Sequence, residues 1–178
     1  MNNAIIVSLL LCALPSGSMA DKPKVTRTTL DAMEKSIDGK LQSLFTPESA
    51  EIVGVTQGAY INGYGAVFMS EVNLAPAPGI SPFHPTLKPE EIKRTYDRKT
   101  QRIAALRNAM RQMLVDTAAS LDTVPADEQV ALSVSLFYWT WENREALPAQ
   151  IVMHAPKKLL LQAKAGTADK GAITSEEF

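Results

Sequence analysis

The two histidines are the first residues to consider for chemistry, because imidazole is a common metal ligand and general base. His84 and His154 lie seventy residues apart, and neither belongs to an H-x-x-x-H or H-E-x-x-H spacing. The single cysteine, Cys12, lies inside an apolar N-terminal run. A zinc site would therefore need both histidines together with distant carboxylates, and we predict no metal site and no cofactor.

Serine, carboxylate and glycine patterns indicate no recognised catalytic motif. No serine stands in G-x-S-x-G, and Gly63 and Gly65 do not belong to a phosphate-binding loop. Glu90 and Glu91 are adjacent, so on a helix they point about 100° apart and cannot face one substrate together. These absences favour a non-enzymatic binding or interaction module, such as a component of an envelope assembly. The alternative is a small secreted hydrolase with a site around His84.

Aromatic residues indicate where a binding surface would lie. Strand alternation places Trp139 and Trp141 opposite Leu136 and Tyr138, on the face that helices would leave uncovered. The loop 75–88 contains four prolines, so we expect it to be stiff and packed, either as a lid or as simple cover. Exposed aromatic side chains usually mark contact with a partner. The predicted binding residues are Tyr60, Tyr64, Phe83, His84, Trp139 and Trp141.

Positive charge gathers in one segment of a chain that is otherwise acidic. Residues 88–111 contain eight Lys or Arg against three Asp or Glu, which is a net charge of +5. The whole chain has a net charge of −1, so the remainder carries −6. Projected on a helix, these charges surround the polar side, which favours a solvated face over an anionic partner. We predict a protein or small-ligand partner and no nucleic acid.

The first twenty residues are typical of an export signal. They carry no charged side chain, are apolar from Ala4 to Leu14, and end on the small residue Ala20 before the charged Asp21. The apolar run is too short for a permanent membrane span. We expect cleavage after Ala20, a periplasmic or secreted protein, and no membrane span afterwards. Cleavage would remove Cys12, leaving a mature chain without thiols or disulfides.

Hydrophobic periodicity predicts the elements that position these residues. Asn62 and Gly63 separate two β-rich runs and indicate a type I′ hairpin turn, and Gly54, Gly58 and Gly65 suggest bulges, strong twist or a close backbone approach. A long helix from Pro89 has an apolar stripe that begins with Ile92 and Tyr96 and that Lys99 and Thr117 interrupt. The predicted helices cover 29–45, 89–122 and 156–165, and the predicted strands cover 51–61, 64–74, 130–139 and 149–155.

The order of these elements is α-β-β-α-β-β-α, which favours the α+β class. Hairpins imply antiparallel pairing, and one apolar stripe per helix implies helices over one sheet face. We predict a two-layer sandwich with an antiparallel sheet of two hairpins, about four strands, covered by helices. One domain should span residues 21–166, followed by a polar and mobile tail at 167–178. Strand pairing between the hairpins and the oligomeric state remain open.

Overall fold

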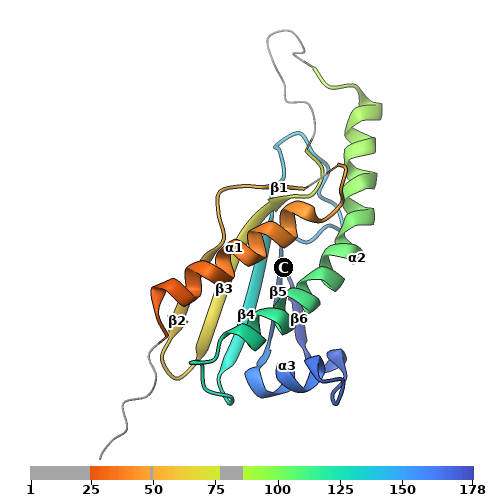
Figure 1. The fold of residues 1–178 in the computed structure, drawn as a ribbon. Coiled ribbons are helices and arrows are strands. Elements are labelled where there is room, and N and C mark those ends of the chain that lie inside the picture. Colours follow the sequence, from red (N-terminus) through yellow and green to blue (C-terminus); the bar gives the residue numbers. More distant parts are fainter. Residues whose placement is uncertain (1–24, 49, 77–85) are drawn as a thin grey trace, which may run out of the picture.

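Figure 1 shows the fold in a computed structural model that describes residues 25–48, 50–76 and 86–178. Within these ranges the chain forms three α-helices and a mixed sheet of six strands, so it belongs to the α+β class. The predicted export signal 1–20 and two predicted binding residues, Phe83 and His84, lie outside the described residues. No helix in the described ranges has the length and hydropathy needed to cross a membrane.

The three helices predicted from periodicity are confirmed, each with its ends within two residues of the expected positions. The elements in chain order are α1 (Arg27–Ser43), β1 (Glu51–Ile52), β2 (Gln57–Ile61), β3 (Gly65–Asn73), α2 (Pro89–Ser120), β4 (Gln129–Leu136), β5 (Gln150–Pro156), α3 (Lys157–Lys164), the 3-10 turn η1 (Lys170–Ala172) and β6 (Thr174–Glu177).

The centre of the sheet is a parallel pair of strands. The strand order is β1-β3-β4-β5-β6, and β2 pairs with β3 on the same edge as β1. β3 and β4 run parallel from Gly65 opposite Gln129 to Val72 opposite Leu136, and all other pairs are antiparallel. The prediction of a purely antiparallel sheet is therefore wrong. The reason is α2, because a long helical connection allows its flanking strands to lie side by side in the same direction.

The hairpin between β2 and β3 is confirmed, although its turn differs from the expected type. Ile61 pairs with Gly65, and the backbone N–H of Tyr64 donates to the carbonyl of Ile61 at 3.0 Å. Of the two central turn residues only Gly63 has a positive φ, at 80°, whereas a type I′ turn needs positive φ at both. Asn62 therefore does not adopt the left-handed conformation that motivated the prediction.

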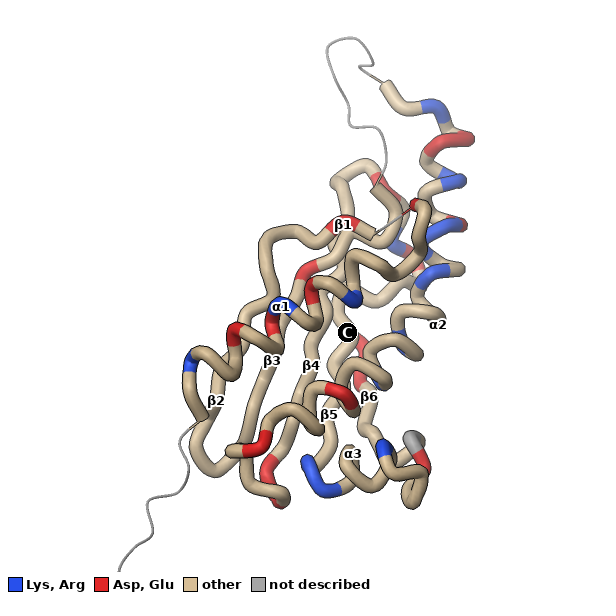
Figure 2. The backbone as a smooth tube through the Cα atoms, viewed as in Figure 1, with Lys and Arg blue, Asp and Glu red and all other residues tan. Residues whose placement is uncertain are grey.

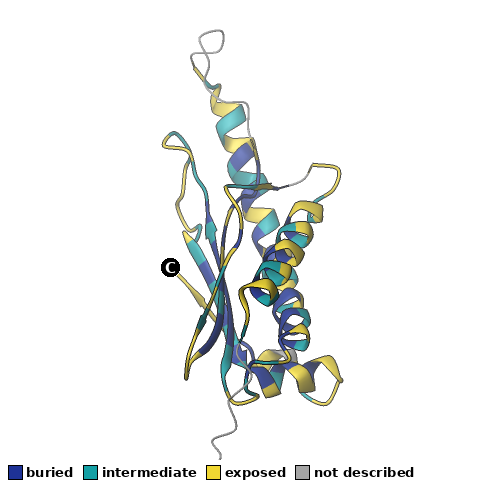
Figure 3. Cartoon of the chain, turned by 60° about the vertical axis from the view of Figure 1, so that its left-hand side comes forward, coloured by how far each residue is buried: buried dark blue, intermediate teal, exposed yellow. Residues whose placement is uncertain are grey.

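The helices pack on one face of the sheet and leave the other face uncovered within the described residues (Figure 3). Alternate residues of β3 point toward the helices, including Phe68, which is fully buried. α1 contributes Ile37 and α2 contributes Leu106, both nearly or completely buried. On the opposite face Met69 is 55% exposed. The core therefore lies between the sheet and the helices, as the single apolar stripe on each helix requires.

The segment 167–178, expected as a polar tail outside the domain, contributes to the sheet. β6 pairs antiparallel with β5, and Ile173 is buried in the core just before it. The guanidinium of Arg107 on α2 donates to both carboxylate oxygens of Glu177, at 2.5 and 2.8 Å. The side chains of β6 are exposed and include two glutamates, which is a common way to protect an edge strand from further pairing.

Candidate functional site

The predicted binding residues within the described ranges lie at two opposite ends of the sheet. Tyr60 and Tyr64 flank the turn at the start of β3, whereas Trp139 and Trp141 follow the end of the parallel strand β4. β3 has nine residues, which at about 3.3 Å per residue separates the two ends by roughly 25–30 Å. The tyrosines and the tryptophans therefore cannot contact one small ligand.

The two tyrosines take part in local contacts near the hairpin turn. The hydroxyl of Tyr60 donates to Glu128 Oε2 at 2.9 Å, and desolvation and this hydrogen bond raise the pKa of the Tyr60 phenol. Tyr64 is 42% exposed, and its carbonyl accepts from the backbone N–H of Gln129 at 2.7 Å. These contacts join the hairpin to the start of β4. Tyr60 and the backbone of Tyr64 therefore have a structural role.

The two tryptophans have different neighbours. Trp139 is 42% exposed and packs edge to face on Phe137, with ring centroids 5.0 Å apart. Trp141 is half-buried and lines a cavity against the first turns of α2. Sequence alternation placed both indoles on the uncovered sheet face, but the chain leaves the strand conformation after Leu136. The period of two therefore does not extend to Trp141, and Trp141, unlike Trp139, belongs to the lining of this cavity.

The cavity at Trp141 has a volume of about 120 Å³ and two chemically different walls. One part of the lining is apolar and comes from the chain after β3, just before α2 and after β4. The other part comes from α2 and is polar. The apolar lining consists of Ala75, Pro76, Leu87 and Trp141, and the polar lining consists of Glu91, Arg94, Thr95 and Arg98.

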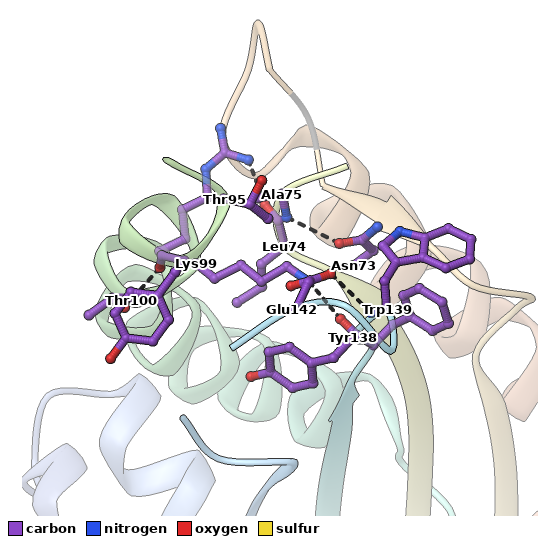
Figure 4. A network of polar contacts seen from close by, with 12 residues as sticks. Asn73, Leu74, Ala75, Thr95, Lys99, Thr100, Tyr138, Trp139 and Glu142 are labelled. Atoms are coloured by element: carbon purple, nitrogen blue, oxygen red, sulfur yellow. Dashed lines mark hydrogen bonds and ion pairs between the residues drawn. The ribbon is translucent and has the colours of Figure 1, made fainter. Parts of the chain in front are cut away.

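A buried ion pair holds the segment that carries Trp141 against α2 (Figure 4). Lys99 Nζ lies 2.7 Å from Glu142 Oε2, and the two side chains are 1% and 3% exposed. Lys99 also donates to the carbonyl of Phe137 at 2.8 Å, and its ammonium lies 4.6 Å from the Tyr138 ring centroid. Since Glu142 directly follows Trp141, this pair holds the backbone at Trp141 close to α2.

Burial controls the protonation of the groups around this ion pair. Desolvation lowers the pKa of Lys99, although the hydrogen bond and charge of Glu142 oppose the shift. Desolvation also raises the pKa of Tyr138 to about 12, with a further contribution from the charge of Glu142. The Lys99 ammonium has acceptors in Phe137 and in both oxygens of Glu142. With its three donors used and its side chain buried, Lys99 positions the segment and contacts no ligand.

Lys99 and Glu142 were not among the predicted site residues. Lys99 interrupts a largely apolar stripe. A charged side chain on the buried face of a helix needs a partner, so this interruption is the signal that could have identified a buried ion pair. The stripe expected from sequence began with Ile92 and Tyr96, which are only half-buried, whereas Thr95 and Lys99 are buried. Glu142 lies in a polar connection whose sequence gives no indication that its side chain is buried.

Three arginines form a row along one side of α2, where Figure 2 shows positive residues along the helix. Arg94, Arg98 and Arg102 recur every four residues, and such residues are neighbours on a helix. Glu48 lies 3.1 Å from Arg98 and 3.4 Å from Arg102. Arg94 has no ion pair with any residue in the described ranges. The positive charges are therefore less evenly spread around α2 than the sequence indicates. The Glu48 carboxylate neutralises the three guanidinium groups only in part.

Arg102, at the inner end of this row, is held by the protein itself. Its guanidinium donates to the carbonyl of Leu74 at 2.5 Å and lies 4.7 Å from the ring centroid of Phe45. Desolvation, together with the charge of Arg98, lowers the pKa of Arg102. Arg94, at the outer end, is exposed. Availability to a ligand therefore increases from Arg102 to Arg94.

The other polar clusters in the described ranges have structural explanations. The hydroxyl oxygens of Thr56 and Ser70 lie 2.7 Å apart, and the hydroxyl of Thr56 donates to Asp38 at 2.5 Å, which joins α1 to the sheet. His154 Nδ1 lies 3.3 Å from Gln129 Oε1 on the uncovered sheet face. No group of three or more His, Cys, Asp or Glu suited to a metal occurs in the part of the chain that the structure describes.

No protein-family model matches the chain, and no match is found among curated proteins or among solved structures. Its function must therefore be inferred from the geometry of the described residues.

Proposed function

We propose that the protein is a non-enzymatic binding module that acts after export and binds its ligand in the cavity at Trp141. The observation that carries this proposal is the meeting of Trp141 with Arg94 and Arg98 around one cavity. The buried pair of Lys99 and Glu142 holds the backbone next to Trp141 against the helix. This part of the lining therefore loses little conformational entropy when a ligand binds.

The groups that line the cavity favour binding over catalysis. The Glu91 carboxylate accepts from the backbone N–H of Lys88 at 2.9 Å, and the hydroxyl of Thr95 donates to the carbonyl of Glu91 at 3.0 Å. Both side chains therefore serve the first turn of α2. Among the described lining residues, none is a nucleophile hydrogen-bonded to a side-chain base, which covalent catalysis would require. Two guanidiniums and an indole instead offer charge and an apolar surface.

Export supports the same interpretation and can be tested separately. The uncharged, apolar segment that ends at Ala20 fits a cleaved signal, and the mature protein would then act in the periplasm or outside the cell. N-terminal sequencing of the protein from its native host should give a chain that begins at Asp21. A mature chain that still begins at Met1 would contradict export by cleavage.

Capture of the ligand from the native envelope fraction tests the binding site. Immobilised wild-type protein should retain a ligand or partner that Trp141→Ala loses. Trp139→Ala is the matched control, since it removes the other indole, which lies outside the cavity lining. Circular dichroism and thermal melting should first show that both variants fold. Retention of the same material by Trp141→Ala, or equal loss in both variants, would overturn the proposal.

A further inference from the structure

We infer that the cavity at Trp141 takes a small organic oxyanion, a carboxylate or phosphate group joined to a ring-sized apolar group. The oxyanion would pair with Arg94 and Arg98, and the apolar group would pack against Trp141. This inference rests on the proposed function and specifies the chemistry of its ligand.

The charge around the cavity favours an anion, because two arginines line it against the single carboxylate of Glu91. Like charges four residues apart destabilise a helix, and the row of Arg94, Arg98 and Arg102 contains two such pairs. Glu48 relieves the inner pair, since it contacts Arg98 and Arg102. The side chain of Glu48 is itself 61% exposed, so this relief is partial. A ligand oxyanion beside Arg94 would relieve the outer pair of Arg94 and Arg98, because Arg94 has no ion pair with any described residue.

The arginine geometry selects oxyanions among anions. A guanidinium is planar and presents paired N–H donors, which match two oxygens of a carboxylate or phosphate. Arg102 is committed to Leu74 and Phe45, so it is not available to a ligand. Arg94 makes no hydrogen bond with other side chains in the described ranges and borders the cavity. Arg94 is therefore the primary contact, and Arg98 assists.

The apolar wall determines what the oxyanion is attached to. Pro76, Leu87 and Trp141 supply most of the apolar lining of the cavity that the arginines also border, and an indole is a good partner for a flat ring. The cavity volume of about 120 Å³ is close to the roughly 150 Å³ of a cavity known to hold benzene. The ligand group that enters is therefore one ring or a short acyl chain.

Fluorescence of a single-tryptophan protein tests this inference. The chain has two tryptophans, so Trp139→Phe leaves Trp141 as the only indole reporter. Titration of this variant with benzoate and with phenyl phosphate should change the emission and reach saturation. Benzamide, which has the ring without the charge, should bind at least about fivefold more weakly. The stronger of the two anions identifies the preferred oxyanion.

Matched arginine variants in the same background identify the contact. Arg94→Gln should weaken benzoate or phenyl phosphate binding at least about fivefold. Arg111→Gln should leave binding within twofold, because it makes the same substitution on the same helix roughly 25 Å away. Three results would each overturn the inference. The first is equal affinity for benzamide and the anions, the second is an equal effect of the two arginine variants, and the third is no saturable change in emission with either anion. If Trp141→Ala still loses the captured ligand while these probes fail, the ligand chemistry is wrong and the proposed site remains.

Discussion

Lys99 and Glu142 form an ion pair that crosses from the middle of α2 to the connection between β4 and β5, forty-three residues further along the chain. Both side chains are almost completely buried, and the Glu142 carboxylate also accepts from the backbone N–H of Trp139 at 3.0 Å. Removal of one partner leaves the other charge without compensation in a place that water does not reach. The pair therefore makes the conformation of this connection depend on α2.

Lys99→Met should lower the free energy of unfolding by about 3–5 kcal/mol, because Glu142 would remain buried and unpaired. Lys93→Met is the control, since it breaks an exposed pair with Asp97 and should cost less than about 0.5 kcal/mol. Urea denaturation followed by circular dichroism measures both. A cost for Lys99→Met no larger than that of the control would show that the buried pair contributes nothing to stability.

Lys157→Met should cost about 2–3 kcal/mol, since the ammonium of Lys157 holds the turn that follows α2. Lys157 Nζ donates to the carbonyls of Leu121 at 2.6 Å, Asp122 at 3.3 Å and Val124 at 2.7 Å. Lys158→Met, at the adjacent exposed position, should change stability by less than about 0.5 kcal/mol. Thermal and urea denaturation distinguish the two variants, and similar melting curves for both would refute this role of Lys157.

Stability should fall between pH 10 and pH 12 because of Tyr138. Its pKa is raised from 10 in the unfolded chain to about 12 in the folded protein. The folded state therefore holds the phenol proton more strongly, so this contribution is complete below pH 10 and is lost as the pH rises toward 12.

Urea midpoints at pH 9 and pH 11 measure the effect of Tyr138. Tyr138→Phe also loses the 2.9 Å hydrogen bond to the carbonyl of Pro148, so its stability should be lower at both pH values. Its midpoint should nevertheless fall less between them than that of the wild type. Tyr64→Phe, which removes an exposed hydroxyl, should keep the wild-type pH dependence. The same drop in all three proteins would contradict the raised pKa of Tyr138.

Gly65→Ala should destabilise the fold by more than about 4 kcal/mol, because a Cβ at this position has no space. An added Cβ would lie 1.8 Å from the carbonyl oxygen of Gln129, and φ at Gly65 is 133°. Gly39→Ala on α1 is the control, since nothing lies within 4 Å of the added Cβ, and it should stabilise by about 0.5–1 kcal/mol. Soluble, fully folded Gly65→Ala protein with a wild-type melting temperature would refute the close approach.

Local patterns in the sequence predict the helices and the hairpin well, because these depend on residues close in the chain. Asn62 and Gly63 indicated the hairpin, and Gly65 indicated the close backbone approach that its contact with Gln129 confirms. The parallel pairing of β3 and β4 could not be predicted in this way. It depends on how α2 returns the chain to the sheet, and alternating residues in a strand look the same in either direction.

The candidate site was harder to predict, since its residues come from distant segments. Strand alternation predicts Trp141 as a binding residue on the uncovered sheet face, although β4 ends at Leu136, before Trp141. The sequence favours a solvated helix face for Arg94 and Arg98, which line the same cavity as Trp141. Lys99 was counted with them, although its side chain is buried. A helical projection gives the direction of a side chain and does not say which loop covers it. The connection after β4 decides this, and it has no regular pattern.

The parallel pair at the centre of the sheet also decides how the protein can fold. β3 and β4 are separated by a stretch that includes all of α2, and the pairing of Gly65 with Gln129 closes a loop of sixty-four residues. Closing such a loop costs chain entropy before any contact across it is gained, which slows folding. Until β4 arrives, the hairpin of β2 and β3 has one unpaired edge, the edge of β3 that β4 occupies in the sheet. We therefore expect the N-terminal and C-terminal halves of the chain to fold and unfold in a single cooperative step.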